Sequence, residues 1–384
     1  MSYENLKITY PDLPVVEHRE EFFEMLEKHQ VVIVKADTGS GKSTQLPKFL
    51  LEWYSSKGEA RAHTSEREAR PHNHFKIGVT EPRRLAAISI ADRLREELKD
   101  ETLVSTKIRF WEQGQSDAPI KVMTDGILLQ EFRRDRLFRQ YSAIVIDEAH
   151  ERSLNIDILL GIFKTVLHER PEFKLIVASA TLDAKLFEEF YDNSCVLEAE
   201  GRTFPVDVEY YFGGGSTGSP TLSKVTERSR SELAEGPRFR DISGKGDSGL
   251  LDEARDAILD LETRHRDHLL CFLPTERDIQ DLAGELAHEL DSATFDILPL
   301  YGRMSPDEQR RIFRHTEKTR VVLATNIAET SLTIPGIAYV VDTGTARISR
   351  YNAQSRIQGL PVEDISKASA RQRTGRAGRV KPGV

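Results

Sequence analysis

The sequence predicts an α/β protein of two domains, each with a mostly parallel sheet covered by helices on both faces. Its 384 residues are too many for one ordinary hydrophobic core, so two domains of similar size are expected. Short apolar runs alternate with longer stretches of helical period along most of the chain. Strands that alternate with helices in this way form parallel sheets with helices on both sides.

The first series of apolar runs predicts the strands of an N-terminal domain. Residues 31–36, 76–80, 143–147 and 175–179 are interpreted as buried strands. Helical periodicity covers residues 45–54, 83–98 and 154–167. A polar stretch at residues 55–73 predicts a solvated loop inserted into this domain. We expect the N-terminal domain to span residues 1–200.

A second series predicts a C-terminal domain at residues 201–384. Its strands are expected at residues 268–273, 295–300, 320–324 and 338–342, with helices at 276–290 and 306–315. Residues 212–249 separate the two series and contain many Gly and Ser residues but few large apolar ones. This composition is typical of a flexible insertion or linker.

The composition is that of an ordinary globular protein, with 39% hydrophobic and 30% charged residues. No apolar stretch approaches the roughly 20 residues that cross a bilayer, and the first residues lack the pattern of a signal peptide. We therefore expect a cytoplasmic protein without a membrane partner, and a monomer by default. The net charge of −8 disfavours coating of nucleic acid by bulk electrostatics, so any contact with nucleic acid must be local.

A Gly-rich loop follows the first predicted strand and opens a helix. Such loops turn backbone N–H groups toward phosphates, and the helix N-terminus adds partial positive charge. Lys42 is expected to reach the β- and γ-phosphates and Ser43 to place its hydroxyl on Mg²⁺. A Gly-rich turn without a ligand is the alternative, because Ala36 stands where these loops usually have their first glycine. The predicted nucleotide-binding residues in this loop are Thr38, Gly39, Ser40, Gly41, Lys42, Ser43 and Thr44.

Two adjacent acids, Asp147 and Glu148, end the third predicted strand. In open parallel sheets, ligands bind beyond the carboxyl ends of the strands. Asp147 is expected to hold Mg²⁺ together with Ser43, and Glu148 to orient or deprotonate the attacking water. A surface turn would explain the two acids alone, but a phosphate loop upstream favours the catalytic interpretation.

The ordered motifs of the whole chain resemble superfamily 2 helicases, and within them the DEAH-box RNA helicases. Residues 80–87 (TEPRRLAA), 123–131 (MTDGILLQE), 147–150 (DEAH) and 179–181 (SAT) look like motifs Ia, Ib, II and III. Residues 272–276 (FLPTE), 324–334 (ATNIAETSLTI) and 372–379 (QRTGRAGR) look like motifs IV, V and VI. Residues 344–351 and 358–363 look closest to the bacterial HrpA-type RNA helicases. The resemblance implies two tandem RecA-like domains that use ATP and Mg²⁺ and bind RNA.

The resemblance also implies catalytic and coupling roles in both domains. Arg376 and Arg379 match motif VI arginines that reach the γ-phosphate from the second domain, and residues three apart can share a helix face. Gln372 matches a residue that holds the catalytic water. His150, in relatives, couples the acid motif to the second domain. Ser179 and Thr181 match the pair that links the nucleotide state to domain movement.

The resemblance further implies contacts to the nucleotide base. Arg93 and Phe313 match positions that sandwich the base, one from each domain, and Asp342 matches a ribose contact. Stacking reads any purine face, so nucleotides other than ATP are expected to serve as well. Simple core packing is the alternative for Phe313.

Four residues match positions that contact RNA in relatives. They are Arg84, Thr124, Thr325 and Thr330. An arginine and hydroxyls that contact phosphates and sugars would bind a strand independently of its sequence. The alternative for the threonines is that they only cap local turns.

Helicases of this family continue beyond motif VI into further domains, so we interpret the chain as a fragment or a truncation. Its leading function is an ATP-hydrolysing RNA helicase core. The alternatives are a nucleotide-gated RNA-binding module or inactive remnant, and a translocase that acts on DNA.

Overall fold

The computed structural model divides the chain into two compact units, residues 1–202 and 203–384. It describes residues 8–37, 39–62, 75–179, 184–199, 204–210, 223–224, 248–314, 316–329, 334, 336–348, 350–352, 357–378 and 382–384. None of the helices within these ranges is both long enough and apolar enough to cross a membrane.

The first unit is built on an eight-stranded sheet in the order β4-β3-β5-β2-β6-β7-β1-β8. Every neighbouring pair is parallel except β3 and β4, which form an antiparallel hairpin at the edge. The strands are β1 (Val31–Ala36), β2 (Ile77–Glu81), β3 (Val104–Ile108), β4 (Trp111–Gln113), β5 (Ile120–Thr124), β6 (Ala143–Ile146), β7 (Lys174–Ser179) and β8 (Ser194–Ala199).

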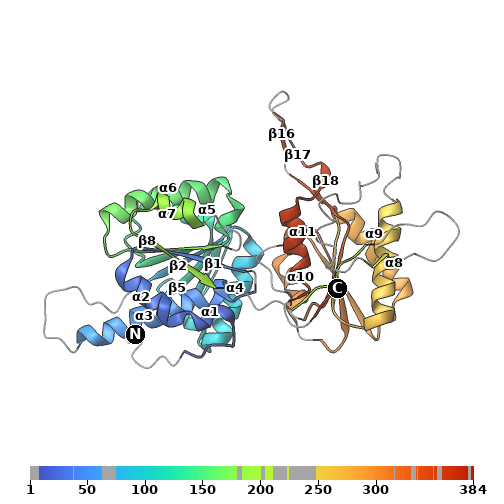
Figure 1. Ribbon diagram of the computed structural model, residues 1–384, viewed down its shortest axis with the longest axis horizontal. Coiled ribbons are helices and arrows are strands. Elements are labelled where there is room, and N and C mark those ends of the chain that lie inside the picture. Colours follow the sequence, from blue (N-terminus) through green and yellow to red (C-terminus); the bar gives the residue numbers. More distant parts are fainter. Residues whose placement is uncertain are drawn as a thin grey trace. The chain divides into compact units, whose positions relative to one another are not determined.

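Helices cover both faces of this sheet (Figure 1). Side chains alternate between the faces, so that Val32 of β1 packs in one core with Phe49 of α3, and Ile33 packs in the other with Phe163 of α6. One face carries α1 (Pro14–Glu17), α2 (Arg19–Lys28), α3 (Lys42–Ala62) and α4 (Arg84–Leu98); the other carries α5 (Asp125–Arg134), α6 (Leu154–Glu169) and α7 (Ala184–Phe190). Two short 3₁₀ helices, η1 (Glu101–Leu103) and η2 (Ala149–Glu151), complete the unit.

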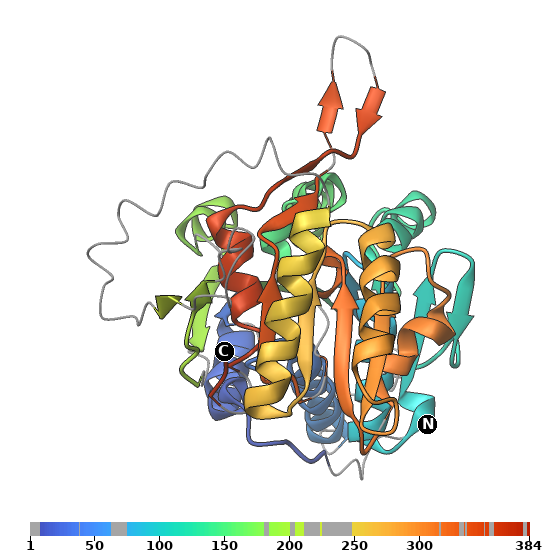
Figure 2. The same cartoon turned by 90° about the vertical axis from the view of Figure 1, so that its right-hand side faces the viewer.

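The second unit has a smaller, fully parallel sheet in the order β12-β13-β11-β14. Helices α8 (Ser248–His265) and α9 (Glu276–Glu289) cover one face, as Figure 2 shows, and bury Ile258 and Leu282 against it. The other face carries α10 (Pro306–Arg310) and α11 (Lys367–Thr374) (Figure 1). The strands are β11 (Leu269–Phe272), β12 (Phe295–Leu300), β13 (Thr319–Ala324) and β14 (Tyr339–Asp342), and the short helices η5 (Arg311–Phe313) and η6 (Asn326–Ala328) flank β13.

Short antiparallel pairs extend the second unit. Strand β15 (Thr345–Arg347) pairs with β18 (Val362–Asp364), and β16 (Arg350–Asn352) pairs with β17 (Ile357–Gly359). The β16–β17 hairpin projects away from the sheet in both views of the molecule (Figures 1 and 2). A further pair joins β9 (Glu209–Tyr210) to β10 (Ser223–Lys224).

The predicted fold class is confirmed, and each of the eight predicted strands is present to within one residue at either end. Two predictions of loops need correction. Helix α3 continues through residues 55–62, where Ser55 Oγ donates to the Leu51 carbonyl at 2.7 Å, so polar side chains are satisfied along the helix itself. Helix α8 begins at Ser248, inside the predicted insertion 212–249, of which otherwise only residues 223–224 are described.

A third correction concerns the predicted helix at residues 306–315. The α-helix ends at Arg310 and continues only as the 3₁₀ turn η5.

Candidate nucleotide-binding and catalytic site

The predicted phosphate loop connects β1 to α3. Gly39 and Gly41 have φ values of 91° and 94°, in the left-handed region that favours glycine. A Cβ on Gly41 would lie 2.7 Å from Leu13 Cδ1, so a larger residue would also clash. Helix α3 begins at Lys42, which places Lys42, Ser43 and Thr44 in its first turn. The first N–H groups of a helix attract anions. Thr38 lies outside the described residues.

The structure explains why alanine is tolerated at the start of this loop. Ala36 is the last residue of β1, and it pairs with Ala199 of β8 in the parallel register. An extended strand residue has no need of the conformations that only glycine adopts. The departure from the usual motif therefore leaves the backbone of the loop unaffected.

The two acids follow β6 and face the phosphate loop. Lys42 Nζ lies 3.8 Å from Glu148 Oε1, and both side chains are almost fully buried. The Glu148 N–H donates to Asp147 Oδ1 at 2.7 Å. Glu148 has a φ of 50°, which is unusual for a residue with a side chain and typical of functional sites. The first unit thus brings Lys42, Asp147 and Glu148 together.

Asp147 and Ser43 suit a divalent cation. Asp147 is fully buried, and its Oδ2 atom has no hydrogen-bond partner in the part of the chain that the structure describes. Burial raises the pKa of Asp147, while the Lys42 charge and a hydrogen bond from the Ser43 hydroxyl oppose that rise. A carboxylate oxygen and a hydroxyl are hard ligands of the kind Mg²⁺ accepts, with phosphate oxygens and water in its other positions. The residues present fit the predicted ion.

A third acid beside this pair, Glu81, was missed in the sequence. It is the last residue of β2 and is completely buried. Burial raises the pKa of Glu81 well above its usual range, and the nearby Asp147 and Glu148 raise it further. An acid at the end of an apolar strand was the signal that selected Asp147, and it also marks Glu81.

Two of the predicted coupling residues meet next to the acids. His150 Nδ1 lies 3.3 Å from Ser179 Oγ and 3.3 Å from Glu148 Oε2. Ser179 ends β7 and is completely buried. A shift of this strand end would therefore move the His150 ring, which contacts Glu148. Thr181 lies outside the described residues.

The motif VI residues lie in the second unit, at the end of α11. Arg376 is buried, and its Nε donates to the Glu329 carbonyl at 3.0 Å. Gln372 is half-buried within α11. The expectation that Arg376 and Arg379 share a helix face is wrong at Arg376. Helix α11 ends at Thr374, and Arg376 lies in the turn that follows, between Gly375 and Gly378. Arg379 lies outside the described residues.

Arg373, which the sequence did not single out, is buried in this segment and pairs with two carboxylates. Its guanidinium pairs with Glu329 at 2.9 Å and with Asp342 at 2.7 Å, and only 1% of its side chain is exposed. It also lies 4.7 Å from the centre of the Phe272 ring. Arg373 therefore ties motif V and the end of β14 to motif VI.

The residues predicted to contact the base and ribose are distributed over both units. Arg93 lies on α4 with 57% of its side chain exposed. Phe313 ends η5 and is half-buried, whereas the neighbouring Ile312 is completely buried and occupies the core position. Core packing is thus the role of Ile312, which leaves the Phe313 ring partly accessible. Asp342 pairs with Arg373 and lies at the end of β14.

The predicted RNA contacts of the first unit lie at the carboxyl-terminal edge of its sheet, where the parallel strands end. Arg84 follows β2 and is exposed, and Thr124 ends the adjacent parallel strand β5. Thr124 precedes α5 without forming a side-chain cap, and Thr325 does the same before η6 in the second unit. Capping does not account for these two threonines. Thr330 lies outside the described residues.

An exposed aromatic residue, Phe110, lies at the same carboxyl-terminal edge of the sheet. Phe110 is 90% exposed, and the Arg109 guanidinium lies 4.8 Å from its ring centre. Its φ of 67° is rarely adopted by aromatic residues. Strand β3 runs parallel to β5 with Lys107 opposite Met123, so Phe110 lies beyond the same strand ends as Thr124. The dipeptide Arg-Phe before a short antiparallel strand was the available signal.

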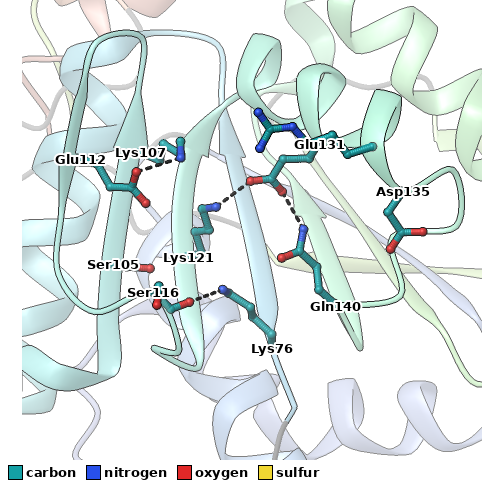
Figure 3. A pocket seen from close by; sticks show the side chains of 10 residues that line it. Lys76, Ser105, Lys107, Glu112, Ser116, Lys121, Glu131, Asp135 and Gln140 are labelled. Atoms are coloured by element: carbon teal, nitrogen blue, oxygen red, sulfur yellow. Dashed lines mark hydrogen bonds and ion pairs between the residues drawn. The ribbon is translucent and has the colours of Figure 1, made fainter.

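A polar pocket of about 360 Å³ lies at the opposite, amino-terminal edge of the same sheet (Figure 3). Lys121 pairs with Glu131 at 2.6 Å, and Lys107 pairs with Glu112 at 2.8 Å. Lys76 donates to the Ser116 carbonyl at 2.6 Å. These lysines already have acceptors within the protein, and none of them belongs to the phosphate site.

Comparisons with known proteins agree with this geometry. Residues 17–190 match the DEAD/DEAH box helicase family, and residues 251–381 match the helicase conserved C-terminal domain. The chain therefore belongs to the DEAD/DEAH box helicases, and its units are the two RecA-like domains of that class.

Individual relatives place the chain near the bacterial DEAH helicases. It is 44% identical over 382 residues to the ATP-dependent RNA helicase HrpA of Escherichia coli (strain K12) and 42% identical over 381 residues to the HrpA homolog of Haemophilus influenzae. Each alignment covers 98% of this chain and 26% of the relative. The crystal structure of the Escherichia coli DEAH/RHA helicase HrpB matches with a TM-score of 0.76 and 32% identity, over 97% of this chain and 42% of that one. The chain thus spans about a quarter of the length of these two relatives.

Proposed function

We propose that this chain hydrolyses ATP and, because it selects little between bases, other nucleoside triphosphates as well. It couples this hydrolysis to movement along RNA or to unwinding of RNA. The observation that carries the proposal is the buried arrangement of Lys42 and Glu148, 3.8 Å apart, at the N-terminus of α3. A cation for the phosphates and a base for water stand next to each other there. The named activities of the HrpA relatives support the same function.

The proposed reaction assigns one task to each residue of the first unit. Backbone N–H groups of the phosphate loop and the Lys42 ammonium bind the β- and γ-phosphates. Glu148 accepts a proton from water as the water oxygen bonds to the γ-phosphorus and the bond to the β,γ-bridging oxygen breaks, which yields ADP and phosphate. Asp147 and Ser43 would hold Mg²⁺, which offsets the negative charge of the phosphates when bound.

The roles of residues in the second unit remain predictions within this proposal. Gln372 would help to orient the water, and Arg376 would add positive charge at the γ-phosphate. In the structure Arg376 donates to the Glu329 carbonyl, so this role requires its guanidinium to offer a further N–H group or to exchange partners.

Phosphate release from ATP by the purified chain tests the proposal. We expect release that single-stranded RNA stimulates and that Lys42→Ala abolishes, because the variant lacks the charge that binds the phosphates. ATP-dependent RNA binding without release would instead indicate a nucleotide-gated binding module. Equal stimulation by RNA and DNA would favour a translocase without a requirement for the 2′-hydroxyl.

For the RNA-binding face, we predict that Phe110→Ala weakens binding of single-stranded RNA by about 5- to 150-fold. Stacking of a base on an aromatic ring contributes roughly 1–3 kcal/mol, and Phe110 offers an exposed ring with Arg109 beside it. Fluorescence anisotropy with a labelled oligonucleotide would measure the change.

A matched control for this experiment is Phe190→Ala. Phe190 on α7 is also exposed and also has a cation, Lys164, 4.8 Å from its ring centre. We expect that variant to bind RNA like the unmodified chain, and Phe110→Trp to retain most of the affinity. Equal affinities for the two alanine variants would exclude stacking on Phe110.

A further inference from the structure

A continuous hydrogen-bonded chain runs from the phosphate loop to Arg93. Gln45, on the first turns of α3, donates through Nε2 to Thr44 Oγ1 at 2.8 Å and to Glu97 Oε2 at 2.9 Å. Glu97, on α4, then accepts from Arg93 Nε through its other oxygen, Oε1, at 2.7 Å. Helix α3, whose N-terminus forms part of the phosphate site, is thereby connected to Arg93, the residue predicted to stack on the base.

A buried lysine holds Glu97 in place. Lys48 is completely buried, and its ammonium donates to Glu97 Oε2 at 2.8 Å, to Gln45 Oε1 at 3.0 Å and to the Thr9 carbonyl at 2.8 Å. All three of its protons have acceptors, so the ammonium fixes this carboxylate in one orientation. Burial would raise the pKa of Glu97, but hydrogen bonds from Gln45, Lys48 and Arg93 outweigh burial and lower it.

The consequence for Arg93 is geometric. Its side chain is 57% exposed and, without a partner, would lose much rotational freedom on stacking against a ligand. The bond from Nε to a carboxylate that is itself fixed holds the guanidinium plane in advance. Its second acidic contact, Glu96, lies 3.4 Å away with 69% of its side chain exposed, and so constrains the guanidinium far less.

We propose that Glu97 is a positioning residue for the nucleotide base, acting by orienting the Arg93 guanidinium, with Lys48 and Gln45 as the buried donors that fix its carboxylate. The inference rests on the proposed function, because it assumes that Arg93 stacks on the base. It adds a positioning pair, Lys48 and Glu97, that the proposed reaction does not include.

Glu97→Gln tests the proposal because three donors face the two oxygens of Glu97. A glutamine amide turns an N–H₂ group either toward Lys48 and Gln45 or toward Arg93, so one side of the network loses its acceptor. Glu97→Asp is the second variant. It retains the negative charge for Lys48, but its shorter side chain cannot span from Lys48 to Arg93. Glu96→Gln is the matched control on the same helix.

The readout is a pair of affinities, measured by calorimetry with Mg²⁺ present. ATP carries a base, whereas inorganic triphosphate carries none. We expect both Glu97 variants to weaken ATP binding by about three- to ten-fold, the range of a lost cation–π contact, and to leave triphosphate binding unchanged. Glu96→Gln should change neither affinity. In an Arg93→Ala background, Glu97→Gln should have no further effect on ATP binding.

Two results would overturn the inference. Equal weakening of ATP and triphosphate binding would show that Glu97 supports the phosphate loop or the fold and not Arg93. A full Glu97→Gln effect in the Arg93→Ala background would show that Glu97 acts independently of Arg93. Failure of the proposed function has a different signature, because the unmodified chain would then release no phosphate from ATP. The inference falls with it only if the unmodified chain also binds neither ATP nor triphosphate.

Discussion

Replacing Glu148 with glutamine is expected to lower the rate of ATP hydrolysis by about 10²–10⁴-fold, the contribution of a positioned general base. Glutamine has nearly the same shape and can keep the backbone conformation of Glu148, with its φ of 50°. It cannot accept a proton from water. Because Lys42 and the phosphate loop are unchanged, the affinity for ATP should stay within a few-fold of that of the unmodified chain. Single-turnover hydrolysis and calorimetric binding would measure the two quantities separately.

Glu262→Gln provides a control for the loss of a buried acid as such. Glu262 lies on α8 of the second unit with only 5% of its surface exposed, and the proposed reaction does not involve it. We expect this variant to hydrolyse ATP normally. Turnover retained by Glu148→Gln would remove Glu148 as the base and leave water activation to another group.

The alternation of apolar runs predicted the central strands because parallel strands covered on both faces are apolar throughout. It failed for β5, whose sequence Ile120–Thr124 includes a lysine. Lys121 is nonetheless buried, because Glu131 of α5 lies 2.6 Å from its ammonium. A charge neutralised by a residue on another element is invisible to periodicity, so this strand could not be distinguished from a polar segment.

The phosphate loop and the two acids of the candidate site were predictable because each is a short, contiguous sequence pattern. The phosphate loop is a contiguous segment, and Asp147 with Glu148 directly follows an apolar strand. Glu97 had no such signal, because its partner Lys48 lies 49 positions away in the chain and the pair meets only when α3 packs against α4. Networks formed by packing of distant helices require the structure.

The arginines of motif VI show the same limit. By sequence, Arg373 and Arg376 are equivalent members of one motif, but the resemblance selected Arg376 and Arg379 and left Arg373 out. The structure separates them, since Arg373 pairs with two carboxylates while Arg376 donates to a backbone carbonyl. Two carboxylates held against one buried guanidinium carry a net negative charge when that guanidinium is removed. Arg373 is therefore expected to matter for stability before it matters for catalysis.

Replacing Arg373 with methionine should lower the free energy of unfolding of the second unit by about 3–5 kcal/mol, the usual cost of removing one partner from a buried ion pair. Methionine can preserve the packing on Phe272, so the loss would come from Glu329 and Asp342, which would face each other without a cation. Urea unfolding of the full chain would measure the loss as an earlier transition of the second unit.

The control for this variant is Arg371→Met, two residues earlier on the exposed surface of α11. It removes the same charge without breaking a buried pair, so its unfolding transition should move by at most about 0.5 kcal/mol. Adding Glu329→Gln to Arg373→Met should restore part of the lost stability, because one of the two unpaired charges is removed. Equal transitions for Arg373→Met and Arg371→Met would mean that water or local rearrangement compensates the two acids, and that motif VI is held to β14 by packing alone.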